Sequence, residues 1–267
     1  MSSYSFALSP ARNLVSADLL KLRRSRGLVT VTALLTIGAT VLTFAVMEVM
    51  HLVDPAKHGP AGGILHLGHT AFLVAGLGSV AAAIVASSAA VGDLDSGVYR
   101  DLVVTGRSRL ALYLSRIPAG FLFLLPFVAT AYTLAAVASV VLAGGNPVPG
   151  TQLLWTTGLW SLLEVAFYYL LSFGIACLVA SRAYAIGIVL AWRLALTPVL
   201  AAISALGVVR ELVPGVGLQD LAPAQLGDAV RQGPNVGMTT GAIAAVLIVW
   251  TVVALVAGGW RDTTRDA

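Results

Sequence analysis

The four histidines are the residues best suited to metal chemistry, and all of them fall between His51 and His69. Imidazole is the commonest metal ligand in proteins, and His66 and His69 would share one face of a helix. Their spacings match no strong metal motif, and the single cysteine, Cys177, lies in a distant apolar run. We therefore predict no metal site and favour interfacial histidines at a lumen-facing helix end, with metal binding as the alternative. The residues concerned are His51, Asp54, His58, His66 and His69.

Two charged residues, Glu164 and Arg193, lie inside long apolar runs. A charge near the centre of a bilayer costs about 2.5–3.5 kcal/mol to insert, so both are expected to face protein or water. A tight turn at Ser181-Arg182 predicts that the two runs form antiparallel neighbours. At 1.5 Å per residue the two charges then differ in depth by about 9 Å, so a direct pair needs a reaching arginine or a helix shift. They are either groups of a gate or polar cavity, or a structural link between helices, and we favour the link.

The stretch Gly92 to Arg116 is the long polar interruption that carries both signs of charge. Asp93 or Asp95 can begin a short helix there, and Gly106 is placed to end it. An amphipathic helix of this kind can insert into a groove of a partner protein, whereas the alternative is a lid on the inner leaflet. The apolar positions that share one helix face are Leu94, Val98 and Leu102.

The elements that must position these residues are membrane spans. The 267 residues are 58% hydrophobic and 10% charged, whereas about a quarter of a soluble domain is charged. A spanning helix needs about 20 mostly apolar residues. We therefore predict an all-α polytopic protein with a single transmembrane domain over 1–267. The six predicted spans are about 28–50, 64–91, 110–142, 151–180, 183–209 and 238–258.

The basic residues predict the orientation of the chain. Of the 16 Lys and Arg residues, only Lys57, Arg210 and Arg231 fall on one side of the predicted spans, and Arg193 lies inside one. The others fall on the opposite side, which the positive-inside rule assigns to the cytoplasm. Both termini are then cytoplasmic in a multi-pass protein of the cell membrane. Because the basic residues cluster at span edges, the net charge of +4 does not indicate a nucleic-acid partner.

Two segments outside the spans have helical patterns. Ser9-Pro10 predicts the start of an N-terminal helix over 10–26, with Ala11, Val15, Leu19 and Leu22 at helical spacing. This helix would lie at the inner interface near lipid headgroups, or else be an ordinary solvated helix.

Between the last two spans, 211–237 is long enough to be functional. We predict short extracytoplasmic helices in this segment. Its middle, 218–230, could form an amphipathic one lying on, or partly inside, the outer leaflet, with disorder as the alternative.

Two motifs resemble those of a known family. Lys21-Leu22-Arg23-Arg24 precedes the first span. Asp95-Ser96-Gly97-Val98-Tyr99-Arg100-Asp101-Leu102 is followed by Gly106-Arg107-Ser108-Arg109. Together with six spans and internal termini, they resemble the ABC-type exporter permeases of the second class. In that family a Glu and a Thr commonly flank the loop glycine where this chain has Asp95 and Val98, and a Pro often stands at the place of Arg107.

The resemblance implies a transport subunit rather than an enzyme. Such a subunit dimerises with a second copy or a paralogous permease, contacts membrane lipid, and binds two ATPase subunits through a cytoplasmic coupling helix. The partner would bind ATP and Mg, since the chain has no G-x-x-x-x-G-K-[ST] loop. The cargo would be an amphipathic, lipid-like or drug-like molecule. The expected ATPase contacts are Leu94, Asp95, Gly97, Val98, Arg100, Asp101, Leu102, Gly106 and Arg107.

Two other functions compete with this hypothesis. An integral membrane metal-binding protein or enzyme would use the histidines, but the sequence contains no H-E-x-x-H, no G-x-S-x-G and no paired carboxylates. A secondary transporter would use Glu164, but such proteins usually have related halves, and we find no convincing internal repeat.

Overall fold

The computed structural model describes residues 4–98, 104, 106, 108–230 and 236–264. These residues are mainly helical and contain no strand. Six helices are long and apolar enough to cross a membrane, as predicted. The elements are α1 (Tyr4–Arg24), α2 (Arg26–Ala33), η1 (Leu34–Gly38), α3 (Ala39–Val53), α4 (Ile64–Asp95), α6 (Arg109–Val141), α7 (Thr151–Val179), α8 (Arg182–Leu190), η2 (Ala191–Leu196), α9 (Thr197–Ala202), η3 (Ser204–Leu212), α10 (Pro214–Asp220), η4 (Ala224–Ala229) and α11 (Thr240–Thr264).

The centre of the bundle is formed by α4 and α7. In the most apolar window of each span, 67% of the residues are buried in α4 and 61% in α7, against 22–28% in the other four spans. α4 packs on α7 and α6, and α7 also packs on α11. Small residues allow this close approach. A Cβ atom on Gly78 of α4, for example, would lie 2.8 Å from Cγ2 of Val165 in α7.

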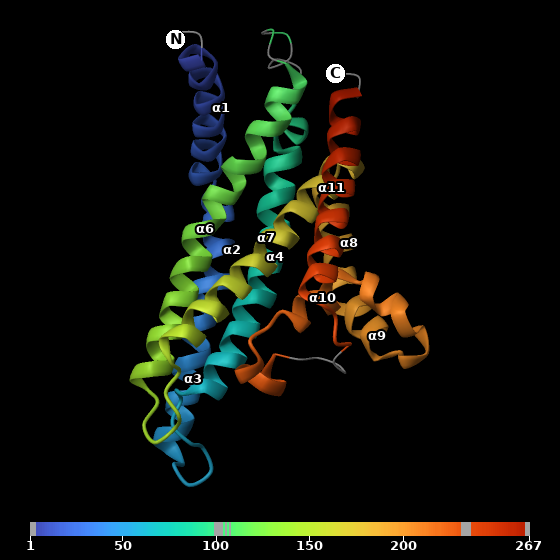
Figure 1. The fold of residues 1–267 in the computed structure, drawn as a ribbon. Helices are drawn as coiled ribbons and strands as arrows, with labels where there is room; N and C mark the ends of the chain where they lie inside the picture. Colours follow the sequence, from blue (N-terminus) through green and yellow to red (C-terminus); the bar gives the residue numbers. More distant parts are fainter. Residues whose placement is uncertain (1–3, 99–103, 105, 107, 231–235, 265–267) are drawn as a thin grey trace.

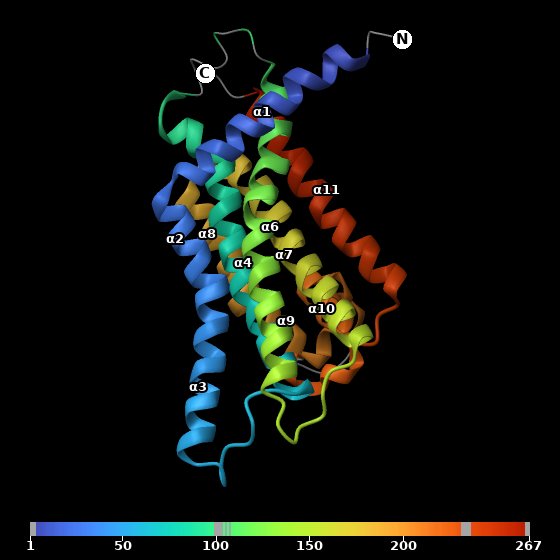
Figure 2. The same cartoon turned by 90° about the vertical axis from the view of Figure 1, so that its left-hand side faces the viewer.

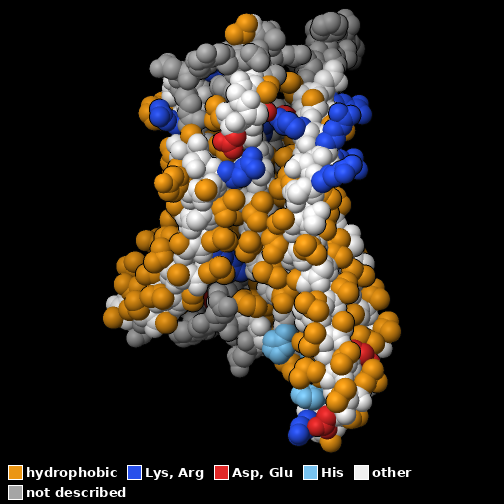
Figure 3. Space-filling model, turned by 180° about the vertical axis from the view of Figure 1, so that it is seen from behind, with side chains coloured by type: hydrophobic (Ala, Val, Ile, Leu, Met, Phe, Trp, Pro, Cys, Tyr) orange, Lys and Arg blue, Asp and Glu red, His pale blue; other side chains and the backbone are white. Residues whose placement is uncertain are grey.

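One end of the bundle, which we call the basic end, gathers α1, the end of α4, the start of α6 and the end of α11 (Figure 1). Lys and Arg side chains are concentrated there, and the surface below is mostly hydrophobic (Figure 3). At the opposite end, α3 leads to α4 and α6 leads to α7 through short connections.

The N-terminal helix begins earlier than predicted. α1 starts at Tyr4, so Ser9 and Pro10 lie inside it rather than at its start. A proline removes one backbone donor but does not by itself end a helix. Extended backbone at Ser25 separates α1 from α2, and α1 crosses the basic end at a steep angle to α2 and α3 (Figure 2). Its Leu22 is buried in the core.

The first and fifth spans each contain a π-helical turn, η1 and η2. π turns are rare and often mark functional positions. In the fifth span the turn comes shortly before Pro198, which has no N–H to donate to a helical carbonyl. The wider turn changes which side chains face the neighbouring helices, and Arg193 lies within it.

The fifth span ends sooner than predicted. The apolar pattern predicts helix up to residue 209, but α9 ends at Ala202 and Ile203 has extended backbone. Gly207 in η3 then adopts φ 49° and ψ −125°, a conformation that glycine reaches without the penalty of a Cβ atom. The predicted span is too long because hydropathy does not distinguish a spanning helix from an apolar turn packed against other helices.

Short helices do lie between the last two spans, as predicted, but 218–230 is not one helix. Two shorter elements, α10 and η4, lie on either side of a break that includes Pro223. Pro214 is the first residue of α10, the helix position that tolerates proline best. Its first six residues, 214–219, are all buried, and Nε1 of Trp160 donates to the carbonyl of Leu218 at 2.7 Å. The segment thus packs against the bundle.

Candidate functional site

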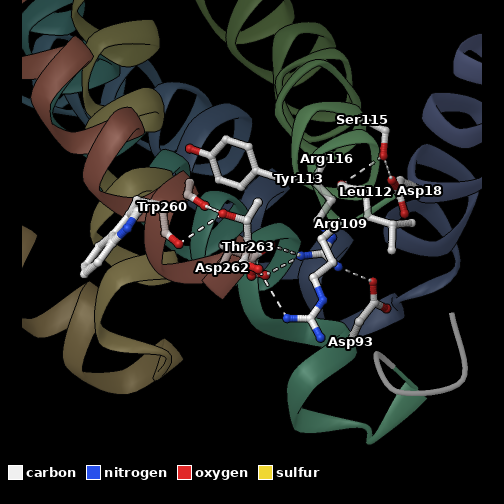
Figure 4. A network of polar contacts seen from close by, with 12 residues as sticks. Asp18, Asp93, Arg109, Leu112, Tyr113, Ser115, Arg116, Trp260, Asp262 and Thr263 are labelled. Atoms are coloured by element: carbon white, nitrogen blue, oxygen red, sulfur yellow. Dashed lines mark hydrogen bonds and ion pairs between the residues drawn. The ribbon is translucent and has the colours of Figure 1, made fainter. Parts of the chain in front are cut away.

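Arg116 of α6 is the centre of a buried ion network at the basic end (Figure 4). Its side chain is 2% exposed, and its Nη2 lies 3.4 Å from Oδ2 of Asp93 in α4. Its Nη1 lies 3.7 Å from Oδ2 of Asp262 in α11 and donates to the carbonyl of Ala90 at 3.2 Å. One guanidinium therefore joins three helices.

The network continues to α1. Nζ of Lys21 lies 2.5 Å from Oδ1 of Asp93 and 3.4 Å from Oδ1 of Asp18. The hydroxyl of Ser115 donates to Oδ2 of Asp18 at 2.8 Å. We call these six residues the basic-end network. They are Asp18, Lys21, Asp93, Ser115, Arg116 and Asp262.

The basic-end network is buried enough to be energetically important. The side chains of Asp93 and Asp262 are 5% and 1% exposed. Removing one partner of a buried ion pair is strongly destabilising, because the remaining charge stays in a poorly solvated place. A second contact, from Nη1 of Arg109 to the carbonyl of Thr263 at 3.2 Å, also joins α6 to α11. The network can therefore make these helices move together.

Sequence reasoning did not predict this network. The hydropathy pattern ends the second and sixth spans at residues 91 and 258, which leaves Asp93 and Asp262 in solvent. In the structure α4 continues to Asp95 and α11 to Thr264. The topology of the spans could have predicted the network. It places three charged residues at the same end of their spans: Asp93, Arg116 and Asp262.

The expected ATPase-contact segment begins differently from the prediction. Asp93 and Asp95 do not cap a separate helix, since both lie in the last turns of α4. The helix ends at Asp95, and Gly97 in the following turn has a φ of 73° and donates its N–H to the carbonyl of Leu94 at 3.1 Å. Gly92 lies inside this helix and does not end it, because one glycine lowers the stability of an alanine-rich helix only modestly.

The remaining contact candidates differ in exposure. Leu94 packs against the main core, whereas Val98 is 43% exposed. Asp95 forms an exposed pair with Arg182 of α8 at 3.4 Å. Gly106 has φ 81°, shortly before α6 begins. The candidates Arg100, Asp101, Leu102 and Arg107 lie outside the described residues.

Glu164 and Arg193 meet in the middle of the bundle. Nη2 of Arg193 donates to Oε1 of Glu164, and the two side chains are only 4% and 6% exposed. The guanidinium also lies over the ring of Tyr168, 5.1 Å from its centroid. The two side chains thus form a direct pair despite the predicted difference of about 9 Å in depth. The arginine of this pair lies in the π turn η2.

The histidines do not converge on one point. Nδ1 of His51 lies 2.6 Å from the carbonyl of His58, and Nδ1 of His66 lies 3.0 Å from the carbonyl of Gly62. The rings of His66 and His69 are 6.4 Å apart and edge-on. Within the described part of the chain, no three His, Cys, Asp or Glu residues are grouped so that they could hold a metal ion. Asp54 instead pairs with Lys57 at 3.4 Å.

Six helices that are long and apolar enough to cross a membrane fit a multi-pass membrane protein. No protein-family model matches the chain, and no curated protein matches it.

Proposed function

We propose that the chain is the transmembrane subunit of an ATP-driven exporter whose ATPase subunits are separate chains. Three features support this: the motifs around Gly97 and Gly106, the six apolar spans, and the lack of a phosphate-binding loop in the sequence. ATP and Mg would then be bound by two partner ATPases. The basic end would face the cytoplasm, since Lys and Arg concentrate there.

The observation that carries the proposal is the position of the basic-end network. The α4–α6 connection begins after Asp95 and ends at Ser108, whose hydroxyl accepts the N–H of Ala111 and so caps α6. Asp93 and Arg116, at the base of the two helices, are paired. A force applied to the connection by a partner would act on both helices at once, and through Lys21 and Asp262 on α1 and α11.

The permease would work as a dimer, with a second copy or a paralogous chain, surrounded by membrane lipid. The interior offers few charges besides Glu164 and Arg193 along the middle of the spans. An amphipathic or lipid-like cargo suits such a path better than an ion, because an ion would need more compensating groups.

Co-purification with an ATPase tests the proposal. Gly97→Pro should abolish binding of the ATPase, since proline cannot adopt the positive φ of this residue. Leu102→Asp should do the same by placing a charge on the apolar stripe. Val148→Asp, at an exposed position of the connection at the opposite end, is the matched control and should leave binding intact. Normal ATPase binding and ATP-dependent transport in both test variants would refute the docking role.

A second function is favoured by the buried Glu164–Arg193 pair. Intramembrane carboxylates often relay protons in secondary transporters. Transport that needs no ATP, follows a proton gradient and is lost in Glu164→Gln would establish that function in place of the first.

A further inference from the structure

A groove of about 420 Å³ opens between α4 and the π turn η2. Phe72, Leu73 and Leu77 of α4 form one side, and Leu194 of η2 contributes to the other. Arg193 also lines the groove, although its side chain is only 6% exposed. A recess with basic atoms in it interrupts the hydrophobic surface in Figure 3. The groove thus combines apolar walls with a hydrogen-bond donor.

Arg193 has more hydrogen-bond donors than its pair with Glu164 uses. A guanidinium carries five N–H groups, and Glu164 accepts from Nη2. Nε is buried and has no hydrogen-bond partner among the described residues. Because Glu164 already balances the charge of Arg193, a further partner of the guanidinium would be a neutral hydrogen-bond acceptor rather than a counter-ion.

Gly76 keeps the groove open above Arg193. Two other glycines in the spanning part of α4 are closely packed, since a Cβ on Gly68 would lie 2.9 Å from Cβ of Ala229 and one on Gly78 would lie 2.8 Å from Val165. A Cβ on Gly76 would meet only Nη2 of Arg193, at 3.8 Å. Glycine inside a helix is less stable than alanine by about 1 kcal/mol. No close packing contact of the described structure requires glycine at this position, whereas a larger side chain would fill the groove.

We propose that this groove binds an uncharged, elongated apolar molecule that carries a carbonyl group, such as the ester or amide of a fatty acid. The carbonyl accepts from the Arg193 guanidinium, and the chain lies along Leu73 and Leu77. A carboxylate would add a net negative charge beside Glu164 in an apolar place, and an ammonium group would be repelled by Arg193. The groove volume falls within the range of about 300–1,000 Å³ that is usual for small-molecule sites.

The groove also continues toward the opposite end of the bundle. His69 lines both this groove and a second cavity of about 870 Å³, which His66, Asn146 and Gln225 line as well. Among these side chains, His69 and Gln225 can donate to a carbonyl that leaves Arg193. The role of this path in export rests on the proposed function, whereas binding in the groove does not.

Photo-crosslinking to the purified full-length chain, in phosphatidylcholine nanodiscs without any ATPase, tests the site. The probe is a diazirine-bearing C18 fatty amide, compared with the matching fatty acid, fatty amine and hydrocarbon. The amide should label the α4 residues 72–80 at least about tenfold more than the hydrocarbon does, the effect of one hydrogen bond to a charged group. Gly76→Leu should remove this labelling. Gly187→Leu, at an open position of α8, should leave it unchanged.

Replacing both charges, as Glu164→Leu with Arg193→Leu, keeps the interior free of unpaired charge and should also reduce amide labelling to the hydrocarbon level. Equal labelling by amide and hydrocarbon, stronger labelling by the fatty acid or the amine, or full labelling of Gly76→Leu would each overturn the proposal. Because no ATPase is present in this experiment, such a result would not contradict the proposed permease function. Conversely, a failure of ATPase binding would not contradict ligand binding in the groove.

Discussion

Asp93 and Arg116 join the end of α4 to the start of α6, with 3.4 Å between Oδ2 and Nη2 and side chains 5% and 2% exposed. The pair lies at the base of the polar α4–α6 connection, so the two helices are held together where a partner would bind. The same guanidinium faces Asp262 of α11. One buried cation thus links three spans at the basic end.

Arg116→Met is expected to destabilise the protein by about 3–5 kcal/mol, the usual cost of breaking a buried ion pair by removing one partner. Methionine fills similar space but leaves Asp93 and Asp262 without this cation. Thermal unfolding of the purified protein in detergent measures the loss. The matched control is Arg182→Met, which breaks the exposed pair with Asp95 and should cost about 0–1 kcal/mol. Equal losses in both variants would show that Arg116 has no special structural role.

The six spans could be predicted because length and hydropathy are local properties of the sequence. Where the prediction was wrong, the decisive property was not local. Apolar content predicts one helix up to residue 209, but the extended backbone at Ile203 and the positive φ of Gly207 belong to a turn. The burial of α10 depends on its packing against other helices, such as the contact of Trp160 with Leu218, which no pattern within 214–220 reveals.

The candidate sites were predictable in part. The two intramembrane charges stand out in an apolar sequence, and their pairing was an open alternative until the π turn η2 placed Arg193 beside Glu164. A π turn changes the helical register, which composition does not report. Asp262 was missed because the hydropathy signal ends before the helix does. The ATPase contacts of the α4–α6 connection stay a prediction.

The Glu164–Arg193 pair should behave as one unit in a double-mutant cycle. Glu164→Leu and Arg193→Leu are each expected to lower the free energy of unfolding by about 3–5 kcal/mol, because each leaves one buried charge alone. The double variant should lose much less than the sum, since it leaves neither. Unfolding of all four proteins by denaturant in mixed micelles gives the coupling energy. Additive losses would mean that the two side chains do not interact.

Close packing of α7 and α11 gives a third prediction. A Cβ atom on Gly174 would lie 2.4 Å from the backbone of Ala254, and one on Gly258 would lie 2.4 Å from the carbonyl oxygen of Gly174. Gly174→Leu should therefore push α11 away from α7. Overpacking usually costs about 1–3 kcal/mol, and here it would also move Asp262 away from Arg116.

The measurement is thermal unfolding together with protease sensitivity at the end of α11. Gly187→Leu is the control, because a Cβ atom there meets nothing within 4 Å. Its unfolding temperature should stay within the error of the parent protein. A Gly174→Leu variant as stable as the control would mean that the two backbones do not approach so closely.

The orientation of the bundle can be tested with cysteine labelling, since the chain has one cysteine, Cys177, and it is buried. In a Cys177→Ala background, a cysteine replaces either Ser96 near the basic end or Gly145 at the opposite end; both positions are exposed. The positive-inside rule puts the basic end in the cytoplasm. A membrane-impermeant maleimide should then label Gly145→Cys in intact cells and Ser96→Cys only after permeabilisation. The reverse pattern would place the α4–α6 connection outside the cell, where no ATP-driven partner could reach it. That result would contradict both the predicted orientation and the proposed function.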